Sequence, residues 1–124
     1  TWVTGVQTCA LPIYGVKPFT NLIFTHDPLA KRRLVLSAHI DSKFYPTHPA
    51  DQFVGATDSA APCAIMMDVA EALTPWLDAR RDRVKNEGGE EGGPEQGETL
   101  QFIYFDGEEA FKDWTHTDSI YGAR

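Results

Sequence analysis

Two acidic residues stand side by side after an apolar run, in the sequence Asp106-Gly107-Glu108-Glu109. Gly107 permits a sharp backbone turn after a buried strand, so that the carboxylates of Glu108 and Glu109 need not point the same way. Such a pair can divide its work, because one carboxylate can bind a metal ion such as zinc while its neighbour accepts and donates protons. The alternative is an exposed acidic turn at the start of a helix, where the helix dipole favours acidic side chains.

Three further polar residues have the same kind of chemistry. Asp58 directly precedes Ser59, which can itself cap a helix and so leave Asp58 available for another role. His39 and Asp41 lie two residues apart at the end of another apolar run, a spacing that points both side chains to the same face of a strand. Histidine and carboxylates together form a common metal-binding set. The alternatives are that Asp58 caps the helix and that His39 supports the site by hydrogen bonding to Asp41.

The segments around these residues predict an α/β fold. Residues 19–25, 33–40 and 99–105 are rich in β-forming and apolar residues and are predicted to be strands. A helix is predicted to begin near Ser59, to show one apolar face, and to bend or end near Pro75, with a further turn or two continuing to residue 83. The apolar residues expected on its buried face are Ile65, Met66, Val69, Ala72, Leu73 and Trp76.

The order of these elements places the polar residues together. Residues 33–105 have the form β–α–β, which predicts a parallel crossover, and ligands bind beyond the carboxyl ends of the strands in such sheets. All five polar candidates are therefore expected at one edge of the sheet. The turn at residues 27–28 would allow the first two strands to pair as a hairpin, and the apolar run 34–36 is typical of a strand covered by helices on both faces.

The composition limits the classes of function. The 124 residues, of which 42% are hydrophobic, suffice for one small domain with one core, and no apolar run approaches the roughly 20 residues of a membrane-spanning helix. The formal net charge is −7, but five acidic residues lie in the Gly-rich stretch 86–98, which is predicted to be a flexible, solvated loop. The remainder is nearly neutral and has no basic stripe, which argues against nucleic-acid binding.

The first residues need a separate interpretation. Residues 3–13 read V-T-G-V-Q-T-C-A-L-P-I and resemble the in-frame translation of a sequencing-library adaptor, and they lack the basic start and longer apolar core of a signal peptide. We interpret residues 1–13 as non-native and leave them out of the fold prediction. Cys9 then falls outside the native chain, so that Cys63 is the one native cysteine and is expected to be a small buried residue in the first turn of the helix.

Four stretches of the sequence closely resemble the zinc-dependent glutaminyl-peptide cyclotransferases of the animal and fungal type, within the zinc aminopeptidase-like superfamily. They read S-A-H-I-D-S-K, F-V-G-A-T-D-S-A-A-P-C-A-I-M-M, F-D-G-E-E-A-F-K-D-W and D-S-I-Y-G-A-R. The resemblance runs from about residue 19 to the end and is interrupted by the Gly/Glu stretch. It implies a three-layer α/β sandwich with a central mixed, mostly parallel sheet, of which residues 14–124 would be the N-terminal portion.

The resemblance also implies a reaction and a role for each site residue. The reaction is cyclisation of the N-terminal glutamine of peptides and proteins to pyroglutamate, with release of ammonia and the assistance of one zinc ion. By motif, Asp58 and Glu109 would bind zinc, Glu108 would be the general acid and base, and Trp114 would wall the substrate pocket. His39 and Asp41, not counted among the ligands, would support the site or bind a second metal ion.

The resemblance leaves three expectations open to test. The family's third zinc ligand is a histidine downstream of Arg124, so the chain is expected to be an inactive, truncated piece of the enzyme. The resemblance also implies an enzyme of the secretory pathway. Members with a cysteine at the position of Ala38 pair it with the counterpart of Cys63, which is therefore expected to be unpaired here. The alternatives are a zinc aminopeptidase of the same superfamily, with two metal ions and His39 as a ligand, and a non-catalytic relative that serves interaction.

Overall fold

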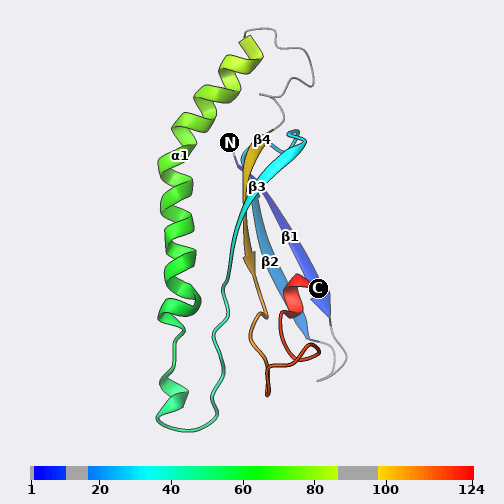
Figure 1. The fold of residues 1–124 in the computed structure, drawn as a ribbon, viewed down its shortest axis with the longest axis vertical. Coiled ribbons are helices and arrows are strands. Elements are labelled where there is room, and N and C mark those ends of the chain that lie inside the picture. The colour runs from blue at the N-terminus through cyan, green and yellow to red at the C-terminus, as the bar shows by residue number, and fades with distance from the viewer. Residues whose placement is uncertain (1, 11–16, 87–97) are drawn as a thin grey trace.

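The computed structural model describes residues 2–10, 17–86 and 98–124. The predicted loop 86–98 lies almost entirely outside the described residues. The chain forms one sheet and one long helix, which runs along one face of the sheet (Figure 1). The strands are β1 (Val3–Ala10), β2 (Pro18–Thr25), β3 (Arg32–His39) and β4 (Glu98–Phe105), and the helices are α1 (Ala61–Asn86) and the short turns η1 (Ala50–Gln52), η2 (Ala56–Ala60) and η3 (Tyr121–Ala123).

The sheet is mixed, with the strand order β1-β2-β4-β3. Strands β3 and β4 are parallel, with Leu36 opposite Phe102 and His39 opposite Phe105, which confirms the predicted β–α–β crossover. The sequence allowed β2 and β3 to pair as a hairpin. That prediction is wrong, because β4 lies between these strands and pairs antiparallel with β2. Strand β1 also pairs antiparallel with β2. In the described part of the chain the sheet is therefore mixed, as expected. It is not mostly parallel, because one of its three strand pairings is parallel and two are antiparallel. One helix covers one face of the sheet (Figure 1).

The core lies between α1 and the central strand β4. Cys63, Met66 and Leu77 of the helix pack with the buried side chains of β4, namely Leu100, Phe102 and Tyr104. Burial of these side chains stabilises the pairing of helix and sheet, at about 1.5–3 kcal/mol for each large apolar side chain. The core also fixes which side of α1 faces the sheet.

The predicted buried face of α1 is correct only in part. Met66 is buried and Val69 is partly buried, but Ile65, Leu73 and Trp76 are exposed. The face of α1 that packs on the sheet carries Cys63, Met66, Ala70 and Leu77. This face is rotated about the helix axis from the one that the apolar residues of the sequence predicted.

The helix continues through Pro75, where the sequence predicted a bend or an end. A proline removes one backbone donor from the helical ladder. The hydroxyl of Thr74 donates to the carbonyl oxygen of Ala70 at 2.6 Å, and Leu77, beyond the proline, is buried in the core. Because Met66 before the proline and Leu77 after it both pack in the core, the helix stays intact, and the axis of α1 bends in its second half (Figure 1).

Strand β3 is an edge strand and not a strand covered on both faces. Leu34 is 67% exposed and Val35 is 44% exposed, although their run of apolar residues predicted burial. At the opposite edge lies β1, which is formed by residues that we interpret as non-native; that interpretation remains a prediction. Within the described ranges, no helix combines the length and the apolar character that crossing a membrane requires.

The segment after β4 turns back and closes on itself. Gly107 has a φ of +66°, and a Cβ at this position would overlap the ring of Phe19, so only glycine fits the turn without strain. The chain returns to this turn at Ile120 and Tyr121. The N–H of Ile120 donates to the carbonyl oxygen of Glu108 at 2.7 Å, and the N–H of Tyr121 donates to the carbonyl oxygen of Gly107 at 2.6 Å. Residues 108–120 therefore form a loop with a hydrogen-bonded neck.

Asp118, inside this loop, gives the fold a defined sensitivity to acid. Burial by itself would raise the pKa of Asp118, but hydrogen bonds from the Tyr121 hydroxyl and from three backbone N–H groups outweigh burial and lower the pKa from 3.8 to about 2. A carboxylate whose pKa is lower in the folded state stabilises the fold above its unfolded pKa. That contribution is lost as the pH falls from 3.8 towards the folded value.

We therefore expect Asp118→Asn to lower the free energy of unfolding of the full-length protein by about 2 kcal/mol near neutral pH. The difference from wild type should shrink as the pH falls from about 4 to about 2, because wild-type Asp118 becomes protonated in that window. Urea unfolding of both proteins across this range measures the difference. A difference that does not change with pH would show that the Asp118 charge contributes nothing.

Candidate functional site

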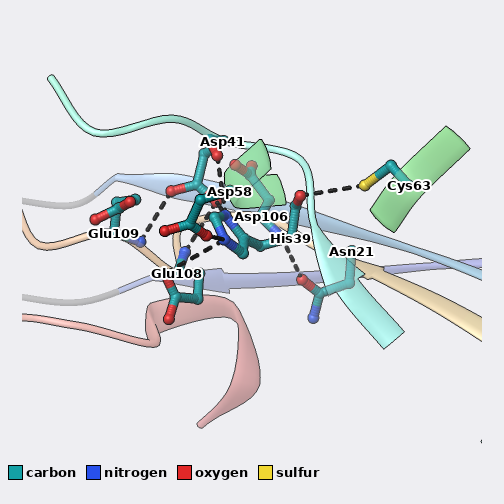
Figure 2. A network of polar contacts seen from close by, with 8 residues as sticks. All are labelled: Asn21, His39, Asp41, Asp58, Cys63, Asp106, Glu108 and Glu109. Atoms are coloured by element: carbon teal, nitrogen blue, oxygen red, sulfur yellow. Dashed lines mark hydrogen bonds and ion pairs between the residues drawn. The ribbon is translucent and has the colours of Figure 1, made fainter. Parts of the chain in front are cut away.

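The candidate site is built around His39, at the carboxyl end of β3. The residue is 8% exposed, and both of its ring nitrogens face oxygen atoms (Figure 2). Nδ1 lies 2.9 Å from the carbonyl oxygen of Asp41, and Nε2 lies 2.8 Å from a carboxylate oxygen of Asp58. The Glu108 carboxylate is 3.8 Å from Nε2. Side chains from three separate segments of the chain thus meet at one ring, at the edge of the sheet where the sequence placed them.

This arrangement favours a charged imidazole. Burial lowers the pKa of His39, but the hydrogen bond to Asp58 and the nearby charge of Glu108 raise it more, together with Asp41, so that the pKa lies above its ordinary value of 6.5. A carbonyl oxygen and a carboxylate oxygen can only accept, so both ring nitrogens must donate if both contacts are hydrogen bonds. The imidazolium form satisfies both contacts, and the neutral form satisfies one.

Asp41 joins the histidine to the acidic pair through the backbone. One of its carboxylate oxygens accepts from the N–H of Glu108 at 3.0 Å, and the other accepts from the N–H of Glu109 at 2.9 Å. The same carboxylate lies 3.5 Å from His39 Nδ1. Two successive amides are thereby held by one side chain, so the orientation of the turn that carries the acidic pair depends on Asp41.

The two glutamates differ in direction and in environment. The Glu108 side chain points towards His39, whereas the Glu109 side chain points away from it (Figure 2). Burial raises the pKa of Glu108, His39 opposes this rise, and the neighbouring carboxylates, among them Glu109 and Asp58, add to it, so that the pKa lies above its ordinary value. A carboxyl group with a raised pKa is better suited to accept and release a proton near neutral pH.

The donor set for a metal ion is of the right type but incomplete. Asp58 has a side chain that is 70% exposed, and Glu109 is partly buried, so both present carboxylate oxygens, which zinc accepts as ligands. Among residues 2–10, 17–86 and 98–124, no group of three His, Cys, Asp or Glu side chains could hold a metal ion. Because zinc sites take three or four protein ligands, a metal held by Asp58 and Glu109 needs at least one ligand from outside the described residues.

Cys63 lies beneath the site, at the start of α1. Its thiol is free and donates to the carbonyl oxygen of His39 at 3.2 Å, and burial raises its pKa. A buried thiol of raised pKa is unreactive, so Cys63 has the packing role that the sequence predicted. Its hydrogen bond also ties the first turn of the helix to the end of β3.

One residue that matters for the site was not singled out from the sequence. Asn21 of β2 is 1% exposed, its amide donates to the carbonyl oxygen of Gly122 at 2.5 Å, and its side-chain oxygen accepts from the N–H of Asp106 at 3.0 Å. It thereby joins both ends of the returning loop to the sheet. An asparagine in the middle of a predicted strand was the available signal, since asparagine is depleted in strands.

Trp114 lies on the loop and is 58% exposed. Its predicted role in the wall of a substrate pocket stays a prediction.

Comparisons with known proteins agree on one family. A model of Peptidase family M28 matches residues 21–124. A glutaminyl-peptide cyclotransferase of Bos taurus is 46% identical over 124 residues, which is 99% of this chain and 32% of the relative. One from Gloydius blomhoffii is 45% identical over 112 residues, which is 90% of this chain and 28% of the relative. The chain thus spans about a third of the length of the curated relatives it matches.

Solved structures give the same picture. The crystal structure of Macrostomum lignano glutaminyl cyclase matches with a TM-score of 0.75 and 41% identity, over 98% of this chain and 31% of that one. The crystal structure of Acidobacteriales bacterium glutaminyl cyclase matches with a TM-score of 0.61 and 26% identity, over 98% of this chain and 34% of that one. Sequence and fold therefore point to the same relatives.

The role of Asp41 can be tested without any assay of function. We expect Asp41→Asn to speed hydrogen exchange at the amides of Glu108 and Glu109 by at least about ten-fold, because a hydrogen bond to a charged acceptor contributes about 1.5–3 kcal/mol. Asn keeps one acceptor oxygen but presents its own N–H₂ group to the other amide. Asp51→Asn, at an exposed position of η1, is the matched control. Equal exchange rates in the two variants would contradict the bridging role.

Proposed function

The chain belongs to peptidase family M28, whose model matches residues 21–124, and we propose that the full-length protein that carries it is a glutaminyl-peptide cyclotransferase. Such an enzyme converts the N-terminal glutamine of peptides and proteins to pyroglutamate. The observation that carries the proposal is the 44–46% identity to proteins of that name over at least 90% of the chain. Because the chain spans about a third of their length, the activity is proposed for the full-length protein.

The proposed reaction needs a proton carrier and no protein nucleophile. The substrate's α-amine attacks the carbon of its own side-chain amide, so the attacking group is already part of the molecule and in reach. A C–N bond forms to close the ring, the bond to the side-chain nitrogen breaks, and one proton passes from the α-amine to the leaving ammonia. Glu108 is the group we assign to this transfer, since it points into the cluster and burial raises its pKa.

Zinc is the metal implied by the resemblance. When bound, it would polarise the oxygen of the scissile amide as a Lewis acid. Asp58 and Glu109 are the residues of this chain that would hold it, and the third ligand, a histidine, would come from outside the chain. With two ligands, the chain by itself should bind zinc weakly. Trp114 would form part of the wall that holds the glutamine side chain.

Two broader features belong to the same proposal. The three-layer sandwich would be completed by the rest of the protein, and this is supported by Leu34 and Val35, whose exposure on the edge strand β3 leaves apolar surface unburied. A location in the secretory pathway is proposed from the resemblance alone. Its partners would be peptides and proteins with an N-terminal glutamine.

The second candidate, a zinc aminopeptidase, is favoured by the family description. In that case His39 would bind a second metal ion through an unprotonated ring nitrogen. The identities of 44–46% to glutaminyl-peptide cyclotransferases favour the first candidate.

An assay on paired substrates separates the two candidates. We expect the full-length protein to release ammonia from a peptide that begins with glutamine and to leave a peptide that begins with leucine intact. We also expect it to contain one zinc ion per chain. Cleavage of the leucine peptide, together with two zinc ions and a metal-bound His39, would establish the aminopeptidase instead.

The roles of the two glutamates can be separated by the same substitution at each position. We expect Glu108→Gln in the full-length protein to retain zinc and to lose about 10²–10⁴-fold in kcat, the usual contribution of a general acid and base. Glu109→Gln should lose affinity for zinc. Zinc titration and steady-state kinetics on both variants measure this, and each variant is the control for the other. The reverse result would show that the two roles are exchanged.

A further inference from the structure

Asp118 is buried in the loop that follows the acidic pair, and its carboxylate accepts four hydrogen bonds. It is 6% exposed. One carboxylate oxygen accepts from the N–H of Phe111 at 2.8 Å and from the hydroxyl of Tyr121 at 2.5 Å. The other accepts from the N–H of Lys112 at 3.0 Å and from that of Asp113 at 3.1 Å. Three successive amides on one side of the loop are thus held by one side chain on the other.

The same carboxylate is connected to the turn that carries Glu108. Tyr121, which donates to it, is 2% exposed, and its ring stacks on that of Phe19 at 5.2 Å, nearly parallel. Phe19 occupies the space that a side chain at Gly107 would need. The N–H of Tyr121 donates to the carbonyl oxygen of Gly107. Asp118, Tyr121 and Phe19 therefore form a packed column beneath the turn.

A strained residue lies between these contacts. Ile120 has a φ of +47°, which is unfavourable for a β-branched side chain and persists only where the surroundings impose it. Its N–H donates to the carbonyl oxygen of Glu108 at 2.7 Å. Ile120 thus lies two residues after Asp118 and directly before Tyr121, between two members of the column.

We propose that Asp118 is a positioning residue for the reaction proposed above: by closing the loop 108–120, it fixes the backbone of Glu108 and the place of Trp114. It does not touch the substrate. It acts through Tyr121 on the turn, and through the amides of residues 111–113 on the segment that leads directly to Trp114. The catalytic consequence rests on the proposed function, whereas the consequence for the turn does not.

The test compares three variants of the full-length protein. Asp118→Asn preserves the size of the side chain but replaces one accepting oxygen by a donor. Tyr121→Phe removes a single hydroxyl, keeps the ring that stacks on Phe19, and remains informative if Asp118→Asn folds poorly. Asp78→Asn is the matched control, because Asp78 is also a hydrogen-bonded carboxylate, bonded to His26 at 2.8 Å, and lies on α1 away from the loop.

Two readouts are measured on folded, zinc-loaded protein. We expect the amides of residues 111–113, 120 and 121 to exchange at least about ten-fold faster in Asp118→Asn than in Asp78→Asn. We expect kcat for a glutamine-initiated peptide to fall at least about ten-fold, because a small displacement of a catalytic group has a large effect on rate. KM should rise as Trp114 moves. Tyr121→Phe should give the same changes, smaller in size.

A purely structural role would lower the melting temperature and leave kcat and KM of the folded molecules as in Asp78→Asn. That result, or unchanged exchange at residues 120 and 121, would overturn the inference. A wild-type protein that does not cyclise glutamine peptides would overturn the proposed function, and the exchange rates would still decide whether Asp118 holds the Glu108 turn.

Discussion

A buried imidazole between acidic side chains organises the whole edge of the sheet. His39 is nearly excluded from water, and oxygen atoms of Asp41 and Asp58 lie within hydrogen-bonding distance of its two ring nitrogens. Polar groups are stable in such surroundings when they are hydrogen-bonded. The loop after β3 and the segment before α1 must therefore approach the strand end together, and this requirement fixes where the Asp58 carboxylate can stand.

The backbone on the far side of His39 depends on the same pairing. The Asp41 carboxylate lies near His39 and also accepts from the backbone N–H groups of Glu108 and Glu109. The position of the turn relative to His39 therefore depends on this one carboxylate. Below the turn, Asn21 and Asp118 hold the two ends and the interior of the returning loop. The backbone of the acidic pair is thus held by hydrogen bonds on both sides, as the proposed role of Glu108 in proton transfer requires.

The arrangement also explains how two adjacent glutamates can have different roles. Gly107 turns the chain at a positive φ, and the two side chains leave the turn in different directions (Figure 2). Burial and neighbouring charges raise the pKa of the one that faces the cluster. The other faces away from His39 (Figure 2). The two carboxylates of one turn thus have different surroundings, which the proposed division between metal binding and proton transfer requires.

The sequence by itself determined three strands, predicted at 19–25, 33–40 and 99–105 and observed within one residue of those bounds. It also determined the crossover helix and the gathering of His39, Asp41, Asp58 and the acidic pair at one edge. These features depend on local periodicity and on the order of elements, which can be read residue by residue. Only the tertiary structure decided that β4 lies between β2 and β3, that α1 presents Cys63 and Leu77 to the sheet, and that it continues through Pro75. The roles of Asn21 and Asp118 also appeared only there. Each of these depends on contacts made after the chain has folded, such as that between Asn21 and Gly122 over 101 residues, and local pattern carries no information about which distant partner a polar side chain will meet.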